Sequence, residues 1–190
     1  MPCHDILVET GIVSATTTQV EAVREFWEYA ISGLNLAYAL RSQPYVDRNG
    51  KIQISLYGPS PTREMTIVDM QTAVSERFNQ TYLAKQLFDA LQSDGYEMHA
   101  IVSPEHEGTW EITARDISRN ATIGVTVYRD MRFEIDFLDA MHDDTVWLAG
   151  GEFGRILEQL RRQGMDVNVV KMDIDEDMKR MASESSRLTV

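Results

Sequence analysis

Near residue 140 the chain gathers acids and a histidine whose side chains could hold a metal ion: Asp136, Asp139, His142, Asp143 and Asp144. Carboxylates and imidazoles bind divalent ions, and a bound ion can activate water for hydrolysis. The spacing follows no fixed ligand pattern, and on a strand Asp136 and Asp139 would point to opposite faces. A solvated loop that leads into a helix is therefore the simpler interpretation. The alternative function is a divalent-metal-dependent hydrolase with the ligands Asp136, Asp139, His142 and Asp143.

A second polar cluster consists of Glu105, His106 and Glu107, and His99 lies on the strand expected before it. A histidine beside carboxylates can act as an acid–base pair or as a metal ligand. Because the cluster lies in a short loop that contains proline and glycine, a polar turn is the simpler interpretation. The chain also has no GxSxG, GxGxxG or lysine-bearing P-loop motif. The sequence therefore predicts no catalytic residue and no cofactor, and it favours a binding protein over an enzyme.

The charge of the chain restricts its partners. The 190 residues include 30 acidic and 18 basic side chains, which gives a formal net charge of −12. Nucleic-acid binding is not expected, because affinity for phosphates depends on clustered lysine and arginine. A protein partner with a basic surface is expected instead, since opposite charges speed association.

The composition, 43% hydrophobic and 25% charged, is that of an ordinary soluble globular protein. No apolar run is long enough to span a bilayer, and the acid at Asp5 argues against a secretory signal, so no membrane association is expected. Cys3 is the only cysteine, which excludes an internal disulfide and favours a reducing, cytoplasmic setting. A bacterial or a viral source is compatible with these features.

The surface expected to bind a basic partner must be carried by β-strands, because residues 96–138 alternate polar and apolar side chains. The alternation predicts four strands, over residues 96–102, 109–116, 121–128 and 131–138. In the last of them Phe133, Ile135 and Phe137 would share one face, and Arg132, Glu134 and Asp136 the other. Period two is typical of a strand with one buried and one wet face. Short polar connections favour antiparallel pairing in chain order.

Apolar residues at helical spacing predict three helices, over residues 19–41, 70–92 and 152–163. Thr18 and Glu21 match a capping box at the start of the first helix, and Pro44 is expected to stop it. Gly95 is expected to cap the second helix. Further strands are predicted over residues 5–14, 52–56, 64–69 and 166–174. Asn49-Gly50 is a preferred dipeptide for a tight hairpin turn, because both positions tolerate positive φ.

The pattern predicts an α+β fold, a largely antiparallel sheet with about three helices packed on one face. We expect a single α+β domain over residues 1–178, with an N-terminal arm or strand in residues 1–17 and a flexible C-terminal tail over residues 179–190. The leading hypothesis is a non-enzymatic intracellular interaction module: an inhibitor, an immunity or anti-defence factor, or an assembly adaptor. Its acidic sheet face would bind the partner through Glu97, Glu111, Glu134 and Asp136. A third hypothesis is a homo-oligomeric structural subunit that pairs exposed strand edges near Lys51–Tyr57.

Overall fold

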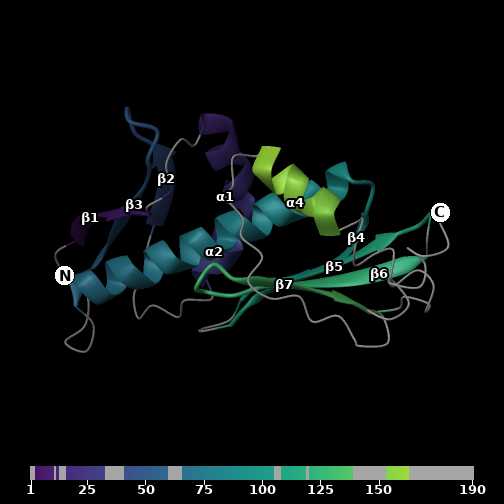
Figure 1. Cartoon of the computed structure of the whole chain (residues 1–190). Helices are drawn as coiled ribbons and strands as arrows, with labels where there is room; N and C mark the ends of the chain where they lie inside the picture. Colours follow the sequence, from purple (N-terminus) through teal and green to yellow (C-terminus); the bar gives the residue numbers. More distant parts are fainter. Residues whose placement is uncertain are drawn as a thin grey trace. The chain divides into compact units, whose positions relative to one another are not determined.

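The computed structural model describes residues 3–10, 12, 16–32, 41–59, 66–104, 108–118, 120–138 and 153–162 (Figure 1). The described residues form helices and two antiparallel sheets, which confirms the expected α+β class. In chain order they form β1 (Cys3–Glu9), α1 (Thr17–Ser32), β2 (Arg41–Val46), β3 (Ile52–Pro59), α2 (Ile67–Ser93), β4 (Glu97–Val102), β5 (Trp110–Asp116), β6 (Ala121–Val127), β7 (Phe133–Phe137) and α4 (Phe153–Arg162). The packing of the helices on one sheet face stays a prediction.

Backbone contacts divide the chain into two compact units. Unit 1 comprises Met1–Lys85, Val102–Glu111 and Thr126–Glu134. Unit 2 comprises Gln86–Ile101, Ile112–Val125 and Ile135–Val190. The single domain expected over residues 1–178 stays a prediction, and the expected tail over residues 179–190 lies outside the described residues.

The first sheet belongs to unit 1 and has the strand order β1-β3-β2, with both pairs antiparallel. Ile6 lies opposite Leu56, and Pro44 lies opposite Ile54. Proline cannot donate to a strand ladder and is tolerated on edge strands, which agrees with the outer position of β2. The free strand edge expected near residues 51–57 is wrong, because β3 is paired on both sides.

The hairpin between β2 and β3 turns at the expected Asn49-Gly50. The Asp47 carboxylate accepts hydrogen bonds from the backbone N–H groups of Lys51, at 3.0 Å, and of Asn49, at 2.8 Å. These bonds, that of Lys51 foremost, lower the pKa of the Asp47 carboxyl below its ordinary value. Only Gly50 of the dipeptide uses the left-handed region, with φ at 75°. The aspartate therefore fixes this turn together with the glycine.

The capping box of α1 lies two residues before the expected one. The Gln19 N–H donates to the Thr16 hydroxyl at 3.2 Å, and the Gln19 side chain accepts from the Thr16 N–H at 2.8 Å. This reciprocal pair satisfies two N–H groups that the first helical turn leaves free. The motif at Thr18 and Glu21 has the same spacing, so local sequence alone could not decide between the two starts.

The expected end of the first helix is wrong, because α1 ends at Ser32 and Arg41 already belongs to β2. Pro44, which was expected to stop the helix, lies inside β2. The apolar residues Leu34 and Tyr38, on which the longer helix was based, lie outside the described residues. Apolar spacing indicates burial, but over a short run it does not separate helix from strand.

The second helix begins earlier than expected, and part of the strand predicted over residues 64–69 is helical instead. The Asp69 N–H donates to the Thr66 hydroxyl at 3.1 Å, and the Asp69 carboxylate accepts from that hydroxyl at 2.6 Å. The side-chain hydrogen bond from Thr66 lowers the pKa of Asp69 below its ordinary value. This pair caps α2 at Ile67, which overrides the strand preference of the β-branched residues that follow.

The end of α2 confirms the predicted glycine cap. Gly95 has φ at 90° and donates its N–H to the Gln92 carbonyl at 3.1 Å. The Tyr96 N–H donates to the Leu91 carbonyl at 3.0 Å. These two bonds form a Schellman motif, which satisfies carbonyls that the last helical turn leaves free.

The core of unit 1 is built around two tryptophans. The Trp110 ring, at the start of β5, stacks on Phe26 of α1 with centroids 5.1 Å apart. Its indole N–H donates to the Thr81 hydroxyl of α2 at 3.1 Å. Trp27 meets Phe78 edge to face at 5.3 Å. A buried tryptophan needs a partner for its N–H, and Thr81 supplies it.

The second sheet has the order β4-β5-β6-β7, which confirms the sequential pairing expected for residues 96–138 (Figure 1). Ile112 and Ala114 of β5 are buried, as are Ile123 and Val125 of β6. The residues between them are exposed or half-buried, as period two requires. The expected third helix is confirmed as α4, with Ile156, Leu157 and Leu160 buried. The strand expected over residues 166–174 lies outside the described residues.

Candidate functional site

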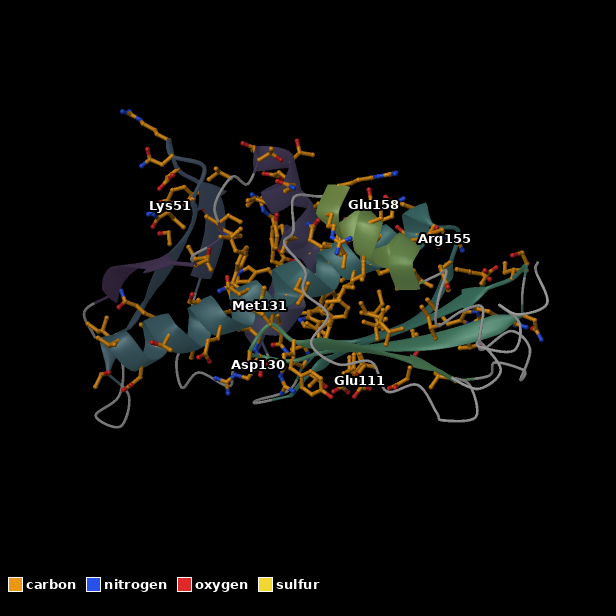
Figure 2. The ribbon with its side chains drawn as sticks, viewed as in Figure 1. Lys51, Glu111, Asp130, Met131, Arg155 and Glu158 are labelled. Atoms are coloured by element: carbon orange, nitrogen blue, oxygen red, sulfur yellow. The ribbon has the colours of Figure 1, made fainter. Side chains whose placement is uncertain are left out.

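The four carboxylates predicted to bind a partner all lie exposed on strands of the second sheet. Glu97 lies on β4, Glu111 on β5, and Glu134 and Asp136 on β7. Trp110 points toward α2, because its indole bonds to Thr81, so Glu111 points away from that helix (Figure 2). We call the side of the second sheet to which Glu111 points the open face; Thr113 and Arg115 alternate with Glu111 along β5 and share this side.

These carboxylates differ in their partners. Glu134 accepts a hydrogen bond from the Tyr128 hydroxyl at 2.8 Å. Glu97 lies 3.9 Å from the His99 ring nitrogen Nε2, both side chains being largely exposed. Glu111 and Asp136 form no hydrogen bond or ion pair with any residue that the structure describes. Their charge is therefore directed to solvent, where a cation from outside the chain could reach it.

In unit 1 the charged residues Asp130 and Arg132 of the turn between β6 and β7 pair with each other. Arg132 Nε lies 2.6 Å from Asp130 Oδ2, and the guanidinium lies 5.0 Å from the centroid of the Tyr128 ring. The hydrogen bond lowers the pKa of Asp130 and raises that of Arg132. Met131 lies at the tip of the turn (Figure 2). Its φ is 68°. This arrangement fixes the start of β7 and with it the position of Glu134.

Polar side chains on α2 connect this turn to the core of unit 1. The Gln80 amide, fully buried, donates to the carbonyls of Gly108 at 3.2 Å and Val127 at 2.9 Å. Arg129 pairs with Glu76 at 2.6 Å. The Gln80 side chain thereby bonds the segment before β5 and the end of β6 to one helix.

Sequence reasoning missed the buried polar residues of α2. Arg77 is 1% exposed, and burial, together with the nearby charge of Arg129, lowers the pKa of its guanidinium. A signal was present, because Val74, Arg77, Phe78 and Thr81 follow the spacing of one helical stripe. Polar residues at apolar positions of a stripe indicate buried hydrogen-bonding groups.

In unit 2 the open face contains a hollow of about 330 Å³ lined by His99, Thr113, Arg115, Asn120 and Thr122. Its side chains come from β4, β5, β6 and the turn between β5 and β6. The Arg115 guanidinium donates to the Asn120 side-chain carbonyl. We call these five residues the polar hollow. Sequence reasoning named only His99 among them, and placed it in a different cluster.

The turn beside the polar hollow is fixed by its own hydrogen bonds. The Asp116 carboxylate, largely buried, accepts from the Ser118 hydroxyl at 2.6 Å and from the Ser118 N–H at 3.0 Å. Asn120 has φ at 52°, a conformation that asparagine tolerates better than most residues. Arg115 and Asn120 therefore project from a defined turn.

The metal site considered from sequence is not tested. Asp136 is exposed on β7, whereas Asp139, His142 and Asp143 lie outside the described residues, as do Glu105, His106 and Glu107. Across residues 3–138 and 153–162, as far as they are described, no three His, Cys, Asp or Glu side chains are grouped so that they could hold a metal ion.

Comparison of the chain with family models, with curated proteins and with solved structures finds no match. None of the helices formed by the described residues is both long and apolar enough to cross a membrane.

Proposed function

We propose that this protein is a non-enzymatic intracellular interaction module that binds a basic protein partner on the open face of its second sheet. The contact residues are the four exposed carboxylates Glu97, Glu111, Glu134 and Asp136. An inhibitor, an immunity or anti-defence factor, and an assembly adaptor are all modules of this kind.

The observation that supports the proposal most is that Glu111 and Asp136 are exposed and have no partner among the described residues. Glu111 lies between the buried Trp110 and Ile112, and Asp136 follows the half-buried Ile135, so the sheet holds the backbone of each in place. Neither carboxylate is neutralised by a described residue. A cationic side chain of a partner can pair with such a carboxylate without first breaking an internal bond. Rigid, uncompensated charges of one sign steer a partner of the opposite sign and speed encounter.

The net charge of −12 acts in the same direction. It repels acidic partners and nucleic acid at long range, and it attracts basic surfaces within about one Debye length, roughly 8 Å at physiological salt. Specific contact then depends on the few carboxylates that the sheet orients.

Charge reversal tests the proposal. The partner would be isolated with the wild-type chain, purified, and its affinity measured by calorimetry across a salt series. Glu111→Lys and Asp136→Lys, singly and combined, are expected to weaken binding, with about a tenfold loss for the double variant and a smaller dependence on salt. Both side chains are exposed, so the fold should persist.

The matched control is Glu21→Lys in α1, which makes the same charge change at a carboxylate already paired with Arg24 at 2.9 Å. It should leave affinity within about twofold if the sheet residues are specific contacts. Equal affinity of the wild type and the double variant at every salt concentration would refute the proposal. An equal loss in Glu21→Lys would show that only net charge matters.

A further inference from the structure

We propose that the polar hollow of unit 2 binds a small oxyanion, a phosphate or carboxylate group carried by a small molecule. The inference does not depend on the acidic contact residues of the proposed function. It depends on the hydrogen-bond donors that line the hollow and on the hydrogen bond between Arg115 and Asn120.

The hollow is rich in hydrogen-bond donors. Arg115 contributes a guanidinium with five N–H groups, of which Asn120 accepts from one nitrogen. Because the Asn120 carbonyl is used in this way, its amide N–H₂ remains the group it can offer to a ligand. Thr113 and Thr122 add hydroxyls that rotate to donate, and His99 adds a ring N–H. An oxyanion, with several acceptor lone pairs and no donor when ionised, matches such a set.

Arg115 differs in its partner from several other arginines of the described residues. Five other arginines pair with carboxylates: Arg24, Arg129, Arg132, Arg155 and Arg162. Arg115 instead bonds to a neutral amide, which orients the guanidinium and leaves its charge uncompensated by any described residue. In a chain with 30 acidic side chains, a positive charge positioned in this way is suited to an external anion.

The dimensions restrict the ligand class. A volume of about 330 Å³ lies at the lower end of the range for small-molecule sites and holds a phosphate or carboxylate with a small organic group. Glu97 lies 3.9 Å from His99 and adds negative charge at that margin. A ligand with several anionic groups is therefore disfavoured, and one oxyanionic head group is the best match.

The test is an NMR titration of the full chain labelled with ¹⁵N, at constant ionic strength, with inorganic phosphate in one arm and acetate in the other. We expect saturable shifts of the backbone amides of Thr113, Arg115, Asn120 and Thr122, with sodium chloride as the reference salt. Saturation with phosphate alone would assign a phosphate site, and saturation with acetate alone a carboxylate site. No saturable shift at these residues with either anion would overturn the proposal.

Two variants and a control sharpen the result. Arg115→Gln is expected to lower the affinity for the anion about tenfold, since it removes a charge-assisted donor. Thr113→Val keeps the size and the strand preference of the side chain while removing one hydroxyl, and should weaken binding to a smaller extent. Arg24→Gln removes one positive charge from the pair with Glu21 in α1 and should leave binding within about twofold. Equal losses in Arg24→Gln and Arg115→Gln would contradict a built site.

Discussion

Two arginines, Arg132 in the turn before β7 in unit 1 and Arg115 on β5 in unit 2, are used in opposite ways. Each adjoins a reverse turn with one non-glycine residue in the left-handed region, Met131 at 68° and Asn120 at 52°. Arg132 pairs with an aspartate and lies over a tyrosine ring, whereas Arg115 bonds to an amide. In the first turn a carboxylate of the fold neutralises the positive charge of the arginine. In the second turn that charge stays available to an external anion. The partner, rather than the residue type, decides which role an arginine has.

The interiors of the two units show a related contrast. In unit 1, buried polar groups of α2 bond to neighbouring segments, as Gln80 does with Gly108 and Val127. In unit 2, the described residues buried beneath the polar hollow are mainly apolar, as Ile112 and Ile123 are. Unit 1 therefore uses polar groups to hold its structure, and unit 2 presents them on a surface supported by an apolar layer.

The largest effect should follow from Trp110→Ala, which removes the anchor of the polar arrangement in unit 1. Loss of the stack on Phe26 and of the bond to Thr81 should lower the free energy of unfolding by about 3–5 kcal/mol. Urea denaturation followed by circular dichroism measures it. Trp110→Phe keeps a ring and should cost clearly less. If both variants were as stable as the wild type, the anchoring role of this residue would be refuted.

An intermediate effect is expected for Gln80→Leu, which keeps the size of the side chain but removes its amide. The carbonyls of Gly108 and Val127 would lose a donor in a buried position, at a cost of about 1–3 kcal/mol. Gln92→Leu, at an exposed position of the same helix, is the control and should be nearly neutral. Equal stability of the two variants would show that the buried amide is dispensable.

The smallest effect concerns pH and compares the two arginine turns directly. The pKa of Asp130 in the folded state is lowered by its hydrogen bond with Arg132, so its carboxylate stabilises the fold above about pH 4, and this contribution is lost as pH falls through the lowered value. Asp130→Asn should therefore lose less stability than the wild type between about pH 5 and pH 2. Arg115→Gln should follow the wild-type profile, because no carboxylate among the described residues pairs with Arg115. A thermal melt at several pH values measures both, and identical profiles for the wild type and Asp130→Asn would contradict the expectation.

The strands and the later helices could be predicted from the sequence because their patterns are local. Alternation over residues 96–138 gave four strands within one or two residues of those observed, and the glycine at position 95 capped α2 as expected. The exposure of Glu97, Glu111, Glu134 and Asp136 followed from the same period. The start of α1 was displaced, because two threonines with identical spacing compete for one cap.

What sequence reasoning missed depends on contacts between distant parts of the chain. β3 is central because it also pairs with β1, which lies before α1 in the chain. The local sequence around β3 therefore could not show that both of its edges are paired. The polar hollow needs His99, Thr113, Arg115 and Thr122 from three adjacent strands, and no sequence spacing encodes that meeting. Arg77 and Gln80 were detectable only as exceptions within an apolar stripe.

Pro44 has a consequence for the outer edge of β2. The Asp47 N–H donates to the Lys51 carbonyl at 2.9 Å, and bonding alternates along an antiparallel pair, so the nitrogen at position 44 faces away from β3. A strand that paired with β2 on this side would meet the proline ring where it needs an N–H donor. The missing donor disfavours the pairing of another strand along β2, so this edge is a poor template for fibrillar self-assembly.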